Sequence, residues 1–165
     1  MMMLDLEKKP ARKKTAPAVI GWMEMASLPL LGLNKIKAKI DTGARTTALH
    51  ATEIEEFERD GVPWVRFCTQ ISEHLPVSRI EAPYHTNRAI KNTSGIPEDR
   101  YIIHTRLQLG KRQWMIDLSI TDRSNMTFPM IIGRAALKDH NIAVHTRKTY
   151  QITEPPQERR RKDYL

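Results

Sequence analysis

The fold is decided by the stretch Ile36-Lys37-Ala38-Lys39-Ile40-Asp41-Thr42-Gly43-Ala44-Arg45-Thr46-Thr47-Ala48-Leu49. Its first residues alternate between apolar side chains and lysines, which is the period-two pattern of a β-strand with one buried face. Asp41 follows where this strand ends, and Gly43 permits a tight turn that a side chain would block. A carboxylate mounted between a strand and a tight turn is held rigidly. The tripeptide alone would indicate only a strand followed by an Asx turn, so the surrounding pattern is what suggests a catalytic carboxylate.

A second informative stretch lies far downstream and reads Phe128-Pro129-Met130-Ile131-Ile132-Gly133-Arg134-Ala135-Ala136-Leu137. It joins a short apolar run, which suits a buried strand, to a Gly-Arg pair and a segment of helical propensity. The Asp-Thr-Gly-Ala turn resembles the active-site motif of retropepsin-like aspartic peptidases. The downstream stretch resembles the strand, Gly-Arg pair and short helix that close the core of those enzymes. Two motifs in this order are more specific than either alone.

More closely, the run from Ile20 to Tyr150 resembles a family of small bacterial and archaeal retropepsin-like proteins. That family is often labelled ATP-dependent zinc protease and is associated with ATP-grasp peptide ligases that add glutamate. The stretches that carry the resemblance are Ala38–Thr46, Trp64–Phe67, Asn92–Gly95 and Ile131–Arg134. The resemblance implies an all-β fold, a small closed β barrel of retropepsin type with one short C-terminal helix. Strand signals at short spacing, with turn signals between them, agree with a closed barrel.

Length and composition fit one soluble domain. The chain has 165 residues, of which 40% are hydrophobic, enough for a core without disulfides. We expect a flexible basic arm over residues 1–17, the retropepsin-like domain over 18–153 and a charged tail over 154–165. Cys68 is the one cysteine, which excludes an internal disulfide and favours a cytoplasmic location. No apolar run is long enough to span a bilayer, so we expect no membrane contact.

The formal net charge of +8 attracts polyanions. Much of the positive charge lies in the two ends of the chain, which we interpret as solvated tails. Aromatic residues do not alternate with the basic ones as they do where single-stranded nucleic acid stacks on a protein. Nucleic-acid binding therefore rests on charge alone, and the composition argues against it.

Within the domain, several local signals place strands and turns. Asp60-Gly61 predicts a hairpin turn after the exposed acidic stretch 53–60, and Gly110 predicts a second one. Residues 71–82 read as irregular, whereas residues 135–140 have the propensity of a short helix.

Hydrolysis by aspartates requires two carboxylates that share one proton. The chain contains a single Asp-Thr-Gly and no internal repeat of the domain. A catalytic pair can therefore form only from Asp41 of two subunits, which predicts a two-fold homodimer. The resemblance further implies that Thr42 anchors the turn by a hydrogen bond across the axis and that Gly43 lets the substrate backbone approach.

One position departs from the retroviral pattern. After Asp-Thr-Gly-Ala the retroviral enzymes carry an acidic residue that contacts substrate and pairs with the downstream arginine, whereas this chain has Arg45 after Ala44. Arg45 cannot pair with Arg134, and its guanidinium could instead hold an acidic substrate group. We expect Arg134, supported by Gly133, to join the last helix to the dimer interface or active-site loop by ion pairing. The alternative is an arginine at a helix N-terminus with no partner.

The polar loop 92–99 lies between the apolar segments 88–91 and 100–104. In retropepsins the hairpin at this place in the order is the flap over bound peptide. The resemblance implies substrate contacts from Thr93, Ser94 and Gly95. A plain exposed hairpin is the alternative that composition leaves open.

The residues do not support the zinc and ATP label. The histidines are His50, His74, His85, His104, His140 and His145, and none forms a His-Glu-x-x-His motif. Cys68 has no second cysteine with which to bind metal, and no glycine-rich loop ends in Gly-Lys-Ser/Thr. The sequence predicts neither a metal site nor a bound cofactor.

Two functions of different class follow. The leading hypothesis is a homodimeric aspartic endopeptidase that acts on peptides, including acidic or glutamylated ones. The alternative is a non-catalytic retropepsin-like partner that binds and regulates an ATP-grasp peptide ligase. The intact Asp41-Thr42-Gly43 motif favours the enzyme.

Overall fold

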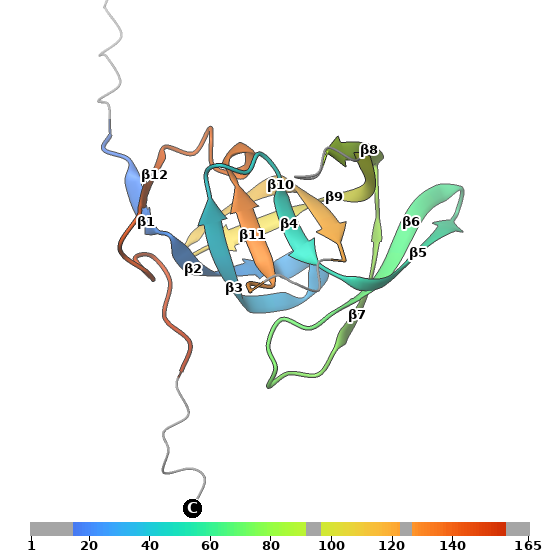
Figure 1. Ribbon diagram of the computed structural model, residues 1–165. Helices are drawn as coiled ribbons and strands as arrows, with labels where there is room; N and C mark the ends of the chain where they lie inside the picture. The colour runs from blue at the N-terminus through green and yellow to red at the C-terminus, as the bar shows by residue number, and fades with distance from the viewer. Residues whose placement is uncertain (1–14, 92–96, 123–126, 158–165) are drawn as a thin grey trace, which may run out of the picture.

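The computed structural model describes residues 15–91, 97–122 and 127–157, and these form a β barrel with a smaller sheet beside it (Figure 1). The strands are β1 (Ala18–Gly21), β2 (Met23–Leu28), β3 (Leu33–Asp41), β4 (Thr47–His50), β5 (Thr52–Arg59), β6 (Val62–Thr69), β7 (Ser78–Pro83), β8 (Thr86–Lys91), β9 (Pro97–Leu109), β10 (Arg112–Thr121), β11 (Met130–Gly133) and β12 (Ile142–His145). Two short 3-10 turns accompany them in the described ranges, η1 (Pro29–Leu31) and η2 (Arg134–Ala136).

The barrel closes on itself. Its strand order is β10-β4-β11-β3-β2-β9, and β9 pairs back with β10, while β8 extends the sheet beyond β9. This confirms the closed all-β barrel expected from the sequence. β11 runs parallel to β3 with Gly133 opposite Asp41, so the two motifs that are far apart in the chain are neighbours in the sheet.

The core follows the alternation seen in the sequence. Ile36, Ala38 and Ile40 of β3 point inward and are at most 6% exposed, whereas the lysines between them face solvent. Apolar residues of the neighbouring strands fill the rest of the interior, among them Leu49, Leu107, Leu118, Met130 and Ile132. Burial of these side chains is the main force that holds the barrel closed.

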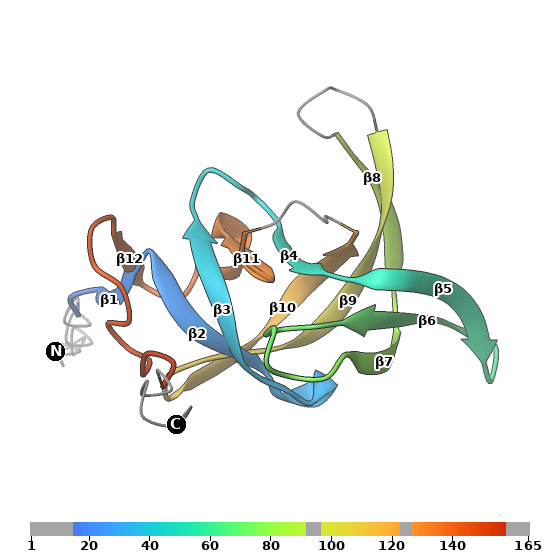
Figure 2. The ribbon, with the colours of Figure 1, turned by 60° about the horizontal axis from the view of Figure 1, so that its bottom comes forward.

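A three-stranded sheet, in the order β5-β6-β7, projects from the side of the barrel (Figure 2). Its first hairpin turns at Asp60 and Gly61, which both have positive φ as a type I′ turn requires, so this predicted turn is confirmed. The expectation of irregular chain over residues 71–82 was partly wrong, because β7 begins at Ser78 and pairs with β6. The alternation of buried and exposed residues in β7 is too short to be recognised from the sequence without its partner strand.

The expected helix over residues 135–140 is shorter than predicted and begins earlier, as the 3-10 turn η2. Leu137 and Lys138 both donate their N–H groups to the carbonyl of Arg134, after which the chain leaves the helical path. Asn141, with φ of 52°, then directs it into β12. The segment between these two strands is too short to propagate a longer helix. None of the helices in the described ranges has the length and apolar character needed to cross a membrane.

Candidate active site

Asp41 is the last residue of β3 and is half-buried. Its Oδ1 accepts hydrogen bonds from the N–H groups of Gly43, at 3.0 Å, and Ala44, at 3.2 Å. The Ala44 N–H is also 3.1 Å from the Asp41 carbonyl, which closes the turn. The carboxylate is therefore oriented through one oxygen by the backbone of its own turn.

Gly43 leaves room at this turn for the carboxylate of Asp41. Its φ lies outside the left-handed region that favours glycine. A Cβ at this position would instead lie 3.2 Å from Asp41 Oδ1, closer than ordinary van der Waals contact. The missing side chain keeps space around the carboxylate, rather than enabling an unusual backbone angle.

Gly133 packs directly against the other side of the active-site loop. A Cβ on it would lie 2.7 Å from the carbonyl carbon and oxygen of Arg45, too close for any side chain. Its N–H donates to the hydroxyl of Thr47 at 3.1 Å. Gly133 thus allows β11 to support the loop that follows Asp41.

Arg134 and Ala135 extend this support by hydrogen bonds. The N–H groups of Arg134 and Ala135 donate to the carbonyls of Ala44 and Arg45, at 2.8 and 3.1 Å. The guanidinium of Arg134 donates to the carbonyl of Gly43 at 3.1 Å. Arg134 therefore contacts the active-site loop as the sequence predicts, but through a backbone carbonyl where an ion pair was expected.

The outer side of this loop is open. Thr42, Gly43 and Arg45 are exposed, and Ala44 is half-buried. Within the ranges the structure describes, the Arg45 side chain makes no ion pair with a carboxylate. The loop that follows Asp41 therefore carries an exposed hydroxyl and an exposed guanidinium.

The predicted flap contacts Thr93, Ser94 and Gly95 lie outside the described residues. The strands that lead into and out of that segment, β8 and β9, form an antiparallel ladder from Thr86↔Ile102 to Lys91↔Pro97. The end of β8 and the beginning of β9 lie at the same end of the barrel as the end of β3 (Figure 2).

Sequence reasoning missed two polar residues that organise this part of the barrel. Thr47 is 1% exposed, and its hydroxyl holds Gly133. Glu24 is 0% exposed and binds the C-terminal segment. Both residues are polar and stand at inward-facing positions of otherwise apolar strands. A buried polar group needs hydrogen-bond partners, so this pattern could have identified them as organising residues.

In the described part of the chain, no group of three or more His, Cys, Asp or Glu side chains is arranged to hold a metal ion. The nearest approach to such a group is Asp117, whose Oδ1 lies 3.1 Å from His104 Nδ1 and 3.6 Å from His85 Nε2. These three side chains are about half exposed and lie on the outer face of the barrel.

A closed β barrel with an Asp-Thr-Gly turn at a strand end, supported from behind by a Gly-Arg segment, defines a retropepsin-like domain. The family described as retropepsin-like aspartic endopeptidase RimB matches residues 19–155, and the chain belongs to this RimB-like family.

Several named proteins resemble this chain. A probable alpha-L-glutamate ligase of Desulfotalea psychrophila is 41% identical over 129 residues, which are 77% of this chain and 28% of that protein. A probable alpha-L-glutamate ligase of Parasynechococcus marenigrum is 42% identical over 125 residues, which are 74% of this chain and 27% of that protein. The chain thus spans little more than a quarter of the length of these relatives. A crystal structure of a Legionella pneumophila protein of unknown function is 30% identical with a TM-score of 0.67, covering 82% of this chain and 98% of that one.

Proposed function

We propose that the protein is an aspartic endopeptidase that acts as a homodimer, with Asp41 from each subunit forming the catalytic pair. The observation that carries this proposal is the mounting of Asp41, half-buried at a strand end and bound through one oxygen by its own turn. The exposed surface of the same turn, Thr42 and Gly43, is where a second copy would meet it.

In this mechanism the two carboxylates share one proton. The ionised Asp41 removes a proton from a water molecule, which attacks the scissile carbonyl carbon, while the protonated Asp41 donates a hydrogen bond to the carbonyl oxygen. The tetrahedral intermediate collapses when the amine leaves with a proton from the pair. The rigid turn matters because both carboxylates must stay close without reorganisation during the reaction.

A mixing experiment tests the shared site. Wild-type protein is mixed with increasing amounts of the Asp41→Asn variant and allowed to exchange subunits. Hydrolysis of a labelled peptide is then measured at constant total protein. If each site needs Asp41 from two subunits, activity falls with the square of the wild-type fraction. A linear fall would show that one chain suffices and would overturn the paired mechanism.

We propose acidic peptides, including glutamylated ones, as the preferred substrates. Arg45 is exposed in the loop that follows Asp41 and makes no ion pair among the described residues. A charge-assisted hydrogen bond contributes about 1.5–3 kcal/mol, so Arg45→Ala should weaken cleavage of acidic peptides roughly tenfold to a hundredfold. Neutral peptides serve as the control, and an equal loss for both classes would show that Arg45 supports the dimer instead.

A second candidate function is regulation of an ATP-grasp glutamate ligase by binding. It is supported by the relatives named probable alpha-L-glutamate ligase, in which the matching segment is part of a longer chain. If this candidate is right, Asp41→Asn protein still binds a ligase and alters its rate of glutamate addition. Loss of that effect with Asp41→Asn would favour the peptidase. We propose a cytoplasmic location for either function, on the ground of the single cysteine.

A further inference from the structure

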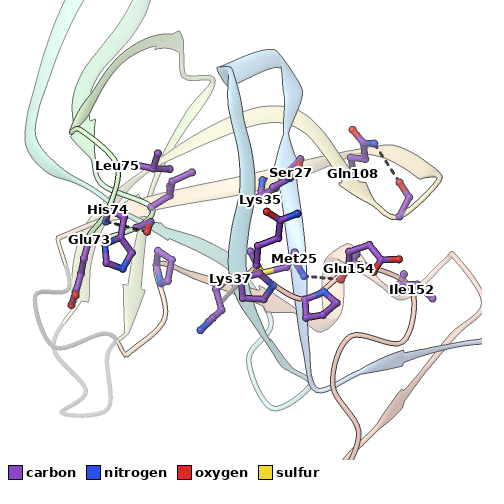
Figure 3. Close-up of a pocket in the computed structure, with 18 of the residues that line it drawn as sticks. Met25, Ser27, Lys35, Lys37, Glu73, His74, Leu75, Gln108, Ile152 and Glu154 are labelled. Atoms are coloured by element: carbon purple, nitrogen blue, oxygen red, sulfur yellow. Dashed lines mark hydrogen bonds between the residues drawn. The ribbon is translucent and has the colours of Figure 1, made fainter. Parts of the chain in front are cut away.

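A groove of about 1340 Å³ crosses the outer face of β2 and β3, away from the Asp41 turn (Figure 3). Its floor includes Met25 and Ser27 of β2 and Lys35 and Lys37 of β3. One wall is the loop 71–75 and the other is the segment 152–157.

The floor presents a ladder of ammonium groups. Lys35, Lys37 and Lys39 are exposed and occupy alternate positions of β3. Alternate residues of a strand are roughly 6.6–6.8 Å apart, which is also the spacing of same-side residues in any extended peptide. Carboxylates on alternate residues of an extended ligand would therefore match the spacing of Lys37 and Lys39, and Lys35 stands next to them at an irregularity of β3.

Lys35, the first lysine of this ladder, has an unusual backbone conformation. Lys35 adopts a positive φ of 56° where the pairing of β2 with β3 shifts register. Its N–H is bound by the hydroxyl of Ser27 at 3.2 Å. Left-handed backbone is unusual for a lysine, and this bulge holds its side chain on the groove side.

None of the three lysines is neutralised by an ion pair within the described ranges. Glu73 and Glu154 belong to the two walls, and Figure 3 shows Glu73 at the outer edge of its loop. His74 adds a further cationic group to the same wall when protonated. The floor is therefore cationic, and the acidic groups stand at the sides.

We propose that this lysine groove, defined by Lys35 and Lys37 with Lys39 beyond it, is a second binding site for an extended acidic peptide. Apolar wall residues such as Ile71, Leu75 and Pro155 suit the backbone and stems of a peptide. The lining contains no Phe, Tyr or Trp on which a nucleic-acid base could stack. These two features favour a peptide over single-stranded nucleic acid.

The groove lies on the same strand as the catalytic turn, with Lys35 six residues and about 20 Å before Asp41. An acidic chain of more than about six residues could therefore occupy the groove and reach the Asp41 turn together. Delivery of the chain to Asp41 rests on the proposed peptidase function, whereas binding of an acidic peptide in the groove does not. The groove would make long acidic chains better substrates than short ones by raising their local concentration.

Binding is tested with the full-length Asp41→Asn protein, which cannot consume the probe by the proposed mechanism. Anisotropy of a fluorescein-labelled peptide of ten glutamates is measured for this protein and for the same protein carrying Lys35→Gln and Lys37→Gln. Glutamine keeps much of the side-chain stem, and both lysines are exposed, so the fold should persist. The matched control carries Arg79→Gln and Lys138→Gln, which remove the same charge from exposed positions outside the groove.

Loss of two solvent-exposed charge pairs should weaken binding roughly threefold to thirtyfold in the groove variant, and less than about twofold in the control. Glu73→Gln should strengthen binding slightly, and added salt should weaken it. Equal weakening in both double variants, or no measurable binding of the peptide, would overturn the proposal. Tighter and lysine-dependent binding of a labelled ten-nucleotide uridylate would also overturn it and assign the groove to nucleic acid.

Hydrolysis by otherwise wild-type protein separates this proposal from the proposed function. Lys35→Gln/Lys37→Gln should raise KM for a twelve-residue acidic peptide and leave kcat, and the cleavage of a four-residue one, unchanged. If the wild type hydrolyses no peptide but the groove still binds glutamates, the peptidase proposal fails alone. If hydrolysis proceeds and the groove variants match the control, the groove proposal fails alone.

Discussion

Glu24 and Asp41 are carboxylates on adjacent strands of one barrel, yet their surroundings are opposite. Glu24 is 0% exposed, and its Oε1 accepts hydrogen bonds from the N–H groups of Gln151, at 2.6 Å, and Ile152, at 2.9 Å. Its Oε2 accepts one from the hydroxyl of Thr153 at 3.0 Å. Asp41 is half-buried, and within the described residues only its Oδ1 is bound, by its own turn.

The difference separates a structural carboxylate from the one that we propose to be catalytic. A buried charge is tolerated only when its oxygens are bound, so Glu24 is fully committed to holding residues 151–153 against β2. Asp41 is fixed in direction by two N–H groups but keeps an oxygen for water or for a partner carboxylate. The position along the strand decides this, because Glu24 lies inside β2 and Asp41 lies where β3 ends.

The strongest test of this comparison is Asp41→Asn. Asparagine can keep an oxygen on the Gly43 and Ala44 N–H groups but cannot act as a base, so hydrolysis should fall by about a hundredfold to ten-thousandfold. The thermal midpoint should stay close to that of the wild type. Peptide hydrolysis and thermal unfolding measured on the same preparation check both parts, and a variant that unfolds would assign Asp41 a structural role like that of Glu24.

Glu24→Gln should give the reverse pattern. The amide leaves at least one buried donor without its charged acceptor, which should lower the free energy of unfolding by about 1–3 kcal/mol. Activity per folded molecule should not change. Denaturant unfolding measures the loss, and Glu154→Gln, which removes the same charge from an exposed neighbour, should cost almost nothing. Similar losses in the two variants would mean that the Glu24 hydrogen bonds contribute little.

A smaller effect should appear at alkaline pH. Burial, and then the negative charge of Glu24, raises the pKa of Tyr150 above its usual value. The folded protein therefore holds the phenolic proton more tightly than the unfolded chain. Stability from this source is complete below about pH 10 and is lost as the pH rises through the folded-state pKa.

Tyr150→Phe should accordingly reduce the loss of stability between about pH 9 and 11 by well under 1 kcal/mol, since the side chain is only partly buried. Thermal midpoints recorded across this range check the prediction, with Tyr84→Phe as the control tyrosine outside the segment. An unchanged pH profile for Tyr150→Phe would show that neither burial nor Glu24 raises the pKa of the phenol on folding.

The sequence alone predicts the elements whose own residues carry a clear strand or turn pattern. The alternation of β3, the Asp60-Gly61 turn and the apolar run of β11 were all recognisable, and together with the motif resemblance they indicated the closed barrel. The helix predicted over residues 135–140 is shortened to the 3-10 turn η2, because only residues 134–141 separate β11 from β12 and Asn141 turns the chain into β12. β7 was missed because its strand character depends on pairing with β6.

Local order of residues thus specifies the strand that carries Asp41 and the turn that follows it. It does not predict the contacts between segments that are far apart in the sequence. Gln151, Ile152 and Thr153, which bind Glu24, lie 127 to 129 residues away, and the approach of Gly133 to the Arg45 carbonyl joins two motifs across the sheet. Neither leaves a periodic signal, because a hydrogen-bonded pair or a close backbone approach depends on where the chain returns and not on its neighbours in sequence.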